Sequence, residues 1–394
     1  MKIIFAVDAI FPPLTGIGRY AWELASGLAK EVDAHEVKYF SHGRFLPNPT
    51  LQNLQQGVQD SKGAGAATTP LAARLRSRLA LFAPAVKVYS AITPYVFGWR
   101  LREFSDHLYH SPNYFLPPFG GTSVATVHDL SWLLYPQFHP EARVAFMNTE
   151  LPKTLRRATH LITDSEFIRQ EVIAQLGWQP EKVTSIPLGV DANFHPRTPE
   201  QTQPVLDTYG LTHGAYTLCV ATIEPRKNID RLISAHQSLP PSLREQFPLV
   251  LVGSPGWNSE SLHERIQKLA GPGLKYLNYV PQEHLCTLFA GARLFAFPSI
   301  YEGFGLPVLE AMASGCPVLI SRNTCLPEVG GSAAWQVEPL DVDDIRDGLV
   351  HALQETQWRT QAITQGLQLA NELTWTRCFK RTRALYDRLQ SHAP

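Results

Sequence analysis

An alternation of short β-branched and aromatic runs with longer amphipathic segments is the feature that most constrains the fold. Each run is long enough for one buried strand, and each segment has the apolar periodicity of a helix. Strand, helix and strand in repeated order predict parallel sheets that helices cover on both faces. The strand-like runs are KIIFAV, SVATVH, THLITDS and VTSIPL in the first half, and TLCVAT, PLVLVG, LKYLNYV, RLFAFPS and CPVLIS in the second.

The length of the chain, 394 residues, exceeds what one hydrophobic core usually fills and predicts two domains. The segment GVDANFHPRTPEQTQP, at 189–204, is proline-rich with little apolar periodicity and is the expected linker. We predict two doubly wound, Rossmann-like α/β domains, 1–195 and 196–374, that face each other across a cleft at the carboxyl ends of their strands. Residues 375–394 form a C-terminal helix whose docking stays open, with the N-terminal domain as the favoured partner.

Charge and cysteine content narrow the class of protein. Lys plus Arg and Asp plus Glu both number 35, so the overall charge gives no reason to expect nucleic acid as a partner. The cysteines are odd in number and form no Cys-x-x-Cys pair, which indicates reduced thiols. The N-terminal run MKIIFAVDAIFPP is broken by Asp8 and is too short for a signal peptide or a membrane span. These features predict a cytoplasmic protein.

One segment, residues 71–102, departs from the strand and helix rhythm. It is cationic and amphipathic, with no acidic residue between Ser61 and Arg102. A helical insertion with a solvated basic face explains it, and so does docking on an anionic membrane or a phosphorylated lipid acceptor. The second interpretation would place the protein peripherally on the inner face of the plasma membrane. The cations of this segment are Arg74, Arg76, Arg78, Lys87, Arg100 and Arg102.

Glycines follow the first predicted strand. Gly16 and Gly18, in FPPLTGIGRY, precede a helix that we expect to start near Arg19. Without Cβ atoms they would let backbone N–H groups approach a phosphate or sugar at a helix N-terminus. The pattern is neither Gly-x-Gly-x-x-Gly nor a P-loop, and a plain turn explains it equally well.

A pair of cations stands in the strand-to-helix loop ATIEPRKN. The strand ends at Thr222 or Ile223, and Arg226 and Lys227 lie just before a helix that begins near Asn228. Two cations at the rim where such folds bind ligands suit a diphosphate, because arginine offers a planar fork and lysine a compact charge. An ordinary solvated basic pair is the alternative.

The stretch YEGFGLPVLEAMASG places two carboxylates around a turn that leads into a helix. The N–H groups of Gly303, Phe304, Gly305 and Leu306 would point outward without acceptors, and Glu302 lies beside them. Glu310 would lie along the helix, where its carboxylate can accept from the vicinal hydroxyls of a ribose. Each glutamate alone fits a solvent-facing or ion-paired role, but the whole arrangement favours a binding site.

Histidines end two strands of the first domain. His128, in SVATVHDLSW, would lie opposite the carboxylate loop, and a structural role is as acceptable as a functional one. His110 has the weaker claim. No His or Cys spacing suits zinc, and the acidic run DVDDI, at 341–345, is better explained as the start of a helix. We therefore expect neither a metal nor any other cofactor, so the cations and helix N-termini would neutralise a diphosphate unaided.

These motifs together resemble the retaining glycosyltransferases of family 4, which have the two-domain GT-B fold. The resemblance covers nearly the whole chain through GIGRY, VHDL, IPLGVD, EPRKN, LVLVG and EGFGLPVLE followed by AMASGCPV. It implies an N-terminal domain on the acceptor side and a C-terminal domain that binds a nucleotide sugar.

The resemblance also implies roles for individual residues. Glu310 would hold the ribose, and Glu302 with the amides of Phe304 and Gly305 would meet the donor sugar. The diphosphate would lie against Arg226, Lys227 and the Gly16 loop; His128 would lie near the reacting carbon, and Val280 in the base pocket at 279–285. Many members have arginine where this chain has Thr222, which puts more weight on the remaining cations.

EPRKN with HDL looks most like bacterial enzymes that move mannose, or a 6-deoxyhexose, from a GDP-sugar to surface polysaccharides. The resemblance implies a metal-independent hexosyltransferase that retains stereochemistry and uses a saccharide or lipid-linked saccharide acceptor. A UDP-sugar donor, a sugar-nucleotide epimerase on the same fold, and a non-catalytic nucleotide-sugar binding module remain as alternatives.

Overall fold

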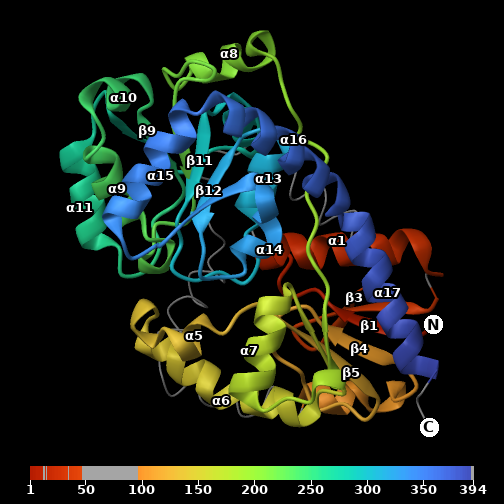
Figure 1. The fold of residues 1–394 in the computed structure, drawn as a ribbon. Helices are drawn as coiled ribbons and strands as arrows, with labels where there is room; N and C mark the ends of the chain where they lie inside the picture. The colour runs from red at the N-terminus through yellow and green to blue at the C-terminus, as the bar shows by residue number, and fades with distance from the viewer. Residues whose placement is uncertain (12–13, 15, 34, 47–95, 392–394) are drawn as a thin grey trace, which may run out of the picture.

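The computed structural model describes residues 1–11, 14, 16–33, 35–46 and 96–391, which form two α/β domains with one sheet each (Figure 1). The N-terminal sheet has the strand order β3-β2-β1-β4-β5-β6-β7, and its pairs are parallel except for the β2–β3 hairpin. The C-terminal sheet has the order β10-β9-β8-β11-β12-β13 and is wholly parallel. The predicted class, two doubly wound α/β domains, is confirmed.

Most strands are short and many are buried on both faces, as their unbroken apolar runs predict. The N-terminal strands are β1 (Ile3–Ala6), β2 (Val37–Ser41), β3 (Arg44–Leu46), β4 (Leu108–Ser111), β5 (Thr122–Val127), β6 (His160–Thr163) and β7 (Val183–Ser185). The C-terminal strands are β8 (Thr217–Val220), β9 (Leu249–Val252), β10 (Leu274–Tyr276), β11 (Leu294–Phe297), β12 (Val318–Ser321) and β13 (Ala334–Val337).

Helices follow most strands and connect them to their parallel neighbours. In the described part of the first domain they are α1 (Gly16–Glu31), α5 (Ser131–Leu134), α6 (Glu141–Arg157) and α7 (Glu166–Leu176), and residues 96–101 are also helical. Those of the second are α8 (Pro199–Asp207), α9 (Ile229–Gln237), α10 (Pro241–Gln246), α11 (Glu260–Leu269), α12 (Gln282–Gly291), α13 (Leu306–Ala313), α14 (Leu326–Gly330), α15 (Val342–Gln354) and α16 (Thr356–Glu372). The last helix is α17 (Trp375–Ser391).

Alternate residues of one strand enter different cores. In β1, Ile3 and Phe5 belong to a cluster on one face of the sheet, whereas Ile4 and Ala6 belong to a cluster on the other. The first of these clusters continues into the C-terminal domain and includes Trp375 of α17. The two domains therefore share one apolar core along this side.

The C-terminal helix crosses from the second domain to the first. In Figure 1, α17 runs from the end of α16 along α1 towards the two chain termini. A Cβ atom on Gly27 of α1 would lie 2.4 Å from the ring of Phe379, so the two helices are in close contact. Arg383 adds an ion pair to Glu31 at 3.2 Å.

The linker prediction needs a correction, because α8 begins at Pro199, inside the predicted irregular segment. A capping box explains this start: Thr198 N–H donates to Gln201 Oε1 at 2.9 Å, and proline occupies the first turn. The part of the linker before α8 passes close to the start of α17. A Cβ atom on Gly189 would lie 2.0 Å from the backbone nitrogen of Trp375.

Other expectations have mixed outcomes. Asp341 does cap α15, accepting from the N–H groups of Asp343 and Asp344, and all five cysteines are buried and free. The hairpin of β2 and β3 and the edge strand β13 were not predicted.

Most of the cationic segment 71–102 lies outside the described residues. Only its last part, residues 96–102, is described. Among the residues that the structure describes, none of the helices combines the length and apolar character needed to cross a membrane.

The carboxyl ends of both sheets meet where the two domains touch. Ser165, after β6, donates its hydroxyl to Gly303 O at 2.8 Å. The carboxylate of Glu328 on α14 accepts from Glu166 N at the start of α7 at 2.8 Å. These contacts bring loops of the two domains together at the predicted ligand-binding edge.

Candidate active site

The switch point of the C-terminal sheet lies between β8 and β11, which are neighbours although the chain runs from β8 to β9. In open α/β sheets, ligands bind outside the carboxyl ends of the strands at such a point. The loop after β8 carries EPRKN, and the loop after β11 carries YEGFG. Asn228, which caps α9 with φ of 59°, donates from Nδ2 to Pro298 O at 2.9 Å and holds the two loops together.

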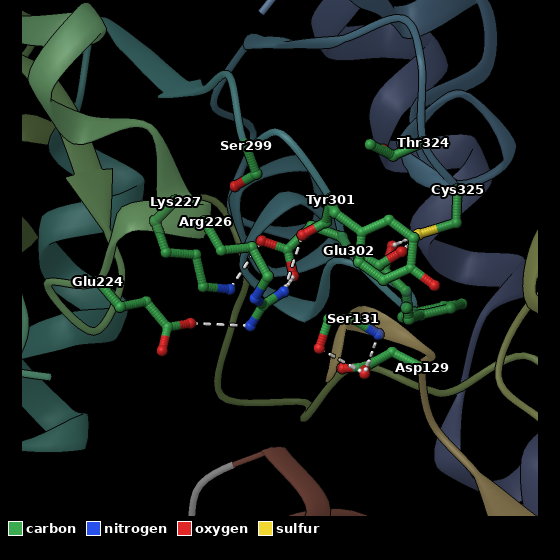
Figure 2. A network of polar contacts seen from close by, with 12 residues as sticks. Asp129, Ser131, Glu224, Arg226, Lys227, Ser299, Tyr301, Glu302, Thr324 and Cys325 are labelled. Atoms are coloured by element: carbon green, nitrogen blue, oxygen red, sulfur yellow. Dashed lines mark hydrogen bonds and ion pairs between the residues drawn. The ribbon is translucent and has the colours of Figure 1, made fainter. Parts of the chain in front are cut away.

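One carboxylate binds both predicted cations (Figure 2). Lys227 Nζ lies 2.7 Å from Glu302 Oε1, and Arg226 Nη1 lies 2.9 Å from Glu302 Oε2. A second carboxylate, Glu224 of the same EPRKN motif, accepts from Arg226 Nη2 at 2.9 Å. The structure therefore brings the predicted diphosphate-binding cations together with the first glutamate of the carboxylate loop.

Burial strengthens the electrostatic interactions between the charged groups of this network. Burial alone would lower the pKa of Arg226, but the charges of Glu302, Asp129 and Glu224 raise it above its usual value. Burial likewise would raise the pKa of Glu302, yet Lys227 and Arg226 lower it below its usual range. Arg226 and Glu302 are thus charged at neutral pH. Arg226 Nε is buried and has no hydrogen-bond partner among the described residues.

Asp129 brings a further carboxylate from the N-terminal domain, and sequence reasoning did not assign it a role. Its Oδ1 accepts from Ser131 N at 2.9 Å and Ser131 Oγ at 2.8 Å. Burial would raise the pKa of Asp129, but Arg226 across the junction and the two hydrogen bonds lower it. Tyr114, whose φ is 53°, fixes the Asp129 backbone through its hydroxyl, which accepts from Asp129 N at 3.0 Å.

The backbone around the start of α13 leaves several donors free. Within the described part of the chain, the N–H groups of Phe304, Gly305 and Leu306 reach no acceptor. Gly305 has φ of 104°, where a side chain would be strained, and a Cβ atom on Gly303 would lie 2.0 Å from His128 O. The glycines thus allow the loop to turn and to pass directly against the first domain. The open N–H groups and the helix dipole favour an anion here.

His128 lies in this contact, but its ring is directed into the N-terminal domain. Nδ1 lies 2.7 Å from Asp164 Oδ2, and Nε2 donates to Pro112 O at 2.8 Å. Burial would lower the pKa of His128, but the Asp164 carboxylate raises it above its usual value. With both ring nitrogens engaged, the atom that His128 presents to Gly303 is its carbonyl oxygen.

Glu310 lies on α13 in a second charged group. Burial raises its pKa to about 7, with a lowering contribution from Arg19 and a raising one from Asp191. Arg19 Nη1 lies 3.2 Å from Asp191 Oδ2 and 3.4 Å from Glu23 Oε1. Arg19 comes from α1 and Asp191 from the linker, so Glu310 faces both the first domain and the linker between the domains.

Two family models match the chain. The family model described as "Glycosyltransferase Family 4" matches residues 14–194, and the one described as "Glycosyl transferases group 1" matches residues 211–368. An O-antigen chain mannosyltransferase B of Escherichia coli is 39% identical over 99% of this chain and 100% of its own length. The chain belongs to glycosyltransferase family 4. The predicted family is therefore correct.

Solved structures agree on the fold. Anabaena Alr3699/HepE, in complex with UDP-glucose, superposes with a TM-score of 0.71 at 18% identity and covers 98% of this chain and 100% of its own. WaaG, a glycosyltransferase of lipopolysaccharide biosynthesis, superposes with a TM-score of 0.65 at 17% identity over 98% and 99% of the two chains. At these identities the likeness supports the GT-B fold alone.

The remaining predicted residues take the following positions, with one correction to the predicted start of a helix. Gly16 and Gly18 belong to the first turn of α1, which starts three residues before the expected Arg19. A Cβ atom on Gly18 would lie 2.9 Å from Ala9 O, so packing against the strand-end loop requires glycine there. Val280 is buried between β10 and α12, beside the exposed Tyr279. His110 is fully buried and pairs with Tyr386 and Thr126.

Sequence reasoning missed residues that lie next to predicted ones. Tyr301 precedes Glu302, yet its hydroxyl accepts from Leu130 N at 3.1 Å and donates to Glu171 in the first domain. The sequence did contain a signal for Asp129 and Asp164, because both are polar residues that come just after a strand. Among the described residues, no three His, Cys, Asp or Glu side chains form a group that could hold a metal ion.

Proposed function

We propose that this protein is a retaining mannosyltransferase that transfers mannose from GDP-mannose to a hydroxyl of a saccharide or lipid-linked saccharide in bacterial surface polysaccharide synthesis. The name of the full-length relative, an O-antigen chain mannosyltransferase, supports the sugar and the pathway class. The observation that carries the chemistry is the pair Arg226 and Lys227, held on Glu302 beside the free N–H groups at the start of α13.

This arrangement suits the charge that develops in glycosyl transfer. As the bond between the anomeric carbon and the phosphate oxygen breaks, the leaving diphosphate gains negative charge, which Lys227, Arg226 and the α13 N-terminus would stabilise. The anomeric carbon gains positive charge, which the carboxylates of Glu302 and Asp129 would stabilise. The cations act without a divalent ion in this proposal, so a chelator should leave turnover unchanged.

Retention is proposed to follow from attack on the same face as the leaving group. The acceptor oxygen forms the new bond to the anomeric carbon, while its proton passes to the departing phosphate oxygen. Glu310 would hold the ribose, and Val280 would line the base pocket. His128 would act through its carbonyl oxygen and its contact with Gly303, as a positioning residue.

Two other activities of the same fold are the alternatives. A UDP-sugar donor would leave the diphosphate contacts unchanged and alter only the base pocket near Tyr279 and Val280. A sugar-nucleotide epimerase would need the same donor contacts and no acceptor. A non-catalytic binding module is disfavoured, because burying this many charges gains little for binding alone.

Thermal-shift measurements with GDP-, UDP- and ADP-sugars test the donor. We expect a rise in melting temperature with GDP-mannose that exceeds the rise with the other donors. Mass spectrometry of the best donor with a mannoside acceptor then separates the activities. A glycosylated acceptor supports the transferase, an isomerised donor supports the epimerase, and loss of turnover with chelator would contradict the metal-free mechanism.

Peripheral contact with the inner face of the plasma membrane, through residues 71–102, is a further part of this proposal. The described end of that segment supports it: Trp99 is 62% exposed, and Arg102 lies over its ring at 4.9 Å. Arginine beside an exposed tryptophan suits the boundary between anionic headgroups and acyl chains. Flotation with anionic liposomes tests this contact, and no association at low salt would contradict it.

A further inference from the structure

A polar cluster outside the diphosphate site lies at the carboxyl ends of β1 and β2. Asp8 Oδ1 accepts from His42 N at 2.7 Å and from Ser41 Oγ at 3.2 Å. It also lies 3.1 Å from His42 Nδ1, which is 2.8 Å from Ser41 Oγ. One carboxylate oxygen thus fixes the backbone and the ring of His42 together.

The outer atoms of this cluster remain available. The side chains of Asp8 and His42 are 43% and 73% exposed. Asp8 Oδ2 and His42 Nε2 have no partner within the described part of the chain. The inward atoms position the pair, and the outward atoms face solvent.

His42 occupies a turn position where asparagine, aspartate or glycine is the usual residue. It has φ of 47° and Gly43 has φ of 77°, so the two residues form the tight turn between β2 and β3. Such turns strongly prefer Asn-Gly or Asp-Gly, because both positions need positive φ. Hairpin formation alone would be better served by asparagine. Histidine in place of the asparagine that this turn prefers is consistent with a use for the ring.

The position of the cluster relates it to the reaction centre. His42 follows β2, Asp8 follows β1, and His128 follows β5, all at the same edge of a sheet in which these strands are parallel. With β4 between β1 and β5, the usual strand spacing puts Asp8 about 10 Å and His42 about 15 Å from the end of β5. A short saccharide can span that distance.

An exposed aromatic side chain follows the same strand as Asp8. Phe11, in the loop after β1, is 65% exposed. Its ring can pack against the C–H face of a sugar, while a carboxylate and an imidazole bind the hydroxyl groups.

We propose that Asp8, His42 and Phe11 form the binding site for a saccharide unit of the acceptor, adjacent to its reacting sugar. This inference rests on the proposed transferase function. The chemistry favours a neutral, hydroxyl-rich ligand, because Asp8 would repel a phosphate, whether of the donor or of a lipid carrier. Asp8 Oδ2 accepts from a hydroxyl group, and His42 Nε2 forms a second polar contact.

The approach from the surface is consistent with a long acceptor. The helical residues 96–101 pack on the same turn, where Arg100 Nη1 donates to Gly43 O at 2.7 Å. The described end of the segment 71–102 therefore contacts the turn that carries His42. An acceptor that extends from the membrane to the reaction centre would pass over it.

Steady-state kinetics with GDP-mannose and an octyl α-mannobioside test the site. We expect Asp8→Asn, His42→Asn and Phe11→Ala each to raise the acceptor KM about tenfold, the size of a lost hydrogen bond to a charged group or of a lost apolar contact. The donor KM and the rate of donor hydrolysis without acceptor should stay within about twofold of wild type, since these residues lie outside the diphosphate site.

The variant His42→Asn separates a structural role from a binding role. Asparagine suits the turn, so the melting temperature should be kept or raised. An unchanged acceptor KM in this variant and in Asp8→Asn would overturn the proposal. Asp33 and His35 provide matched controls, because Asp33 Oδ1 accepts from His35 N at 2.9 Å before β2, at the opposite edge of the sheet. Asp33→Asn and His35→Asn should leave the acceptor KM unchanged.

A second measurement distinguishes failure of this site from failure of the proposed function. Saturation-transfer difference NMR with the mannobioside reports binding without turnover. If wild type transfers no mannose, the transferase proposal fails, and the NMR signal still decides whether a saccharide binds. Loss of that signal in Asp8→Asn and its retention in Asp33→Asn supports the site. Equal signals in both variants contradict it.

Discussion

Lys227 and Glu302 join the two loops at the switch point of the C-terminal sheet, with Nζ 2.7 Å from Oε1. The Glu302 carboxylate is thus paired with the Lys227 ammonium group, which is proposed to bind the donor diphosphate. Donor binding must therefore either displace Glu302 from Lys227 or add a phosphate oxygen to the same ammonium group. Glu302 would hold the cations in place while the site is empty and contact the sugar once it is full.

Replacing this carboxylate separates nucleotide binding from catalysis. We expect Glu302→Gln to bind GDP at least as tightly as wild type, because the neutral amide competes less for Lys227 and Arg226. Turnover should fall about a hundredfold, the usual effect of a small misplacement at the reacting centre. Calorimetric titration with GDP and initial rates provide the two readouts. Glu260→Gln, at the exposed start of α11, is the control and should change neither quantity.

Arg226 is expected to matter more for stability than Lys227. Arg226→Met leaves Glu224 buried without its cation and weakens the pairing of Glu302, which should lower the free energy of unfolding by about 3 kcal/mol. In Lys227→Met, Glu302 keeps its ion pair with Arg226, so the loss should be smaller. Chemical denaturation monitored by fluorescence measures both.

The double variant Arg226→Met with Glu224→Gln provides the internal check. Removing the carboxylate that Arg226→Met leaves without a cation should recover part of the stability lost in Arg226→Met, since residues of one ion-pair network do not act additively. Strictly additive losses, or a greater loss in Lys227→Met than in Arg226→Met, would contradict the central position of Arg226.

The sequence was sufficient for those features that depend on local chemistry. Apolar runs located the strands around Phe5, Val127 and Phe297, because a parallel sheet buries both faces of its strands. The motif residues Arg226, Lys227 and Glu302 were correctly brought together, because strand order places the ends of β8 and β11 side by side. Their assigned roles stay predictions.

What the sequence could not reveal depends on contacts between distant segments. His128 was placed correctly at a strand end, but the direction of its ring depends on Asp164, the partner that follows β6. Tyr301 reads as an ordinary apolar residue, although it enters the core of the other domain. The turn between β2 and β3 has the sequence His42-Gly43 and not the Asn-Gly sequence that would have predicted a hairpin.

Glu310 should make donor binding depend on pH. Burial raises its pKa from 4.5 to about 7 in the empty site, and the ionised carboxylate is the form that accepts from both ribose hydroxyls. Donor affinity should therefore rise as the pH increases through about 7. In Glu310→Gln this dependence should be absent, and affinity should be low throughout. Calorimetric titrations with GDP-mannose between pH 6 and 8 test this, and a flat wild-type profile would contradict it.

The same group predicts how stability varies with pH. Because the pKa of Glu310 is raised on folding, from 4.5 to about 7, the folded state holds its proton over a range in which the unfolded state has lost it. The contribution of Glu310 to the free energy of unfolding should therefore decrease as pH rises from about 4.5 to about 7. Glu310→Gln lacks this contribution, so relative to wild type it should gain stability between pH 4 and pH 8. Denaturant titrations at both pH values measure the difference.

Gly303→Ala tests whether the close contact between the domains is needed for activity. The new Cβ atom would lie 2.0 Å from His128 O, so the loop that carries Glu302 must move away from the first domain. We expect at least a hundredfold loss of turnover, because a shift of about 1 Å at the reacting centre has that effect. Gly271→Ala is the matched control, since nothing lies within 4 Å of its Cβ position, and its rate should equal that of wild type. A normal rate in Gly303→Ala would show that the reaction does not require these two loops to meet.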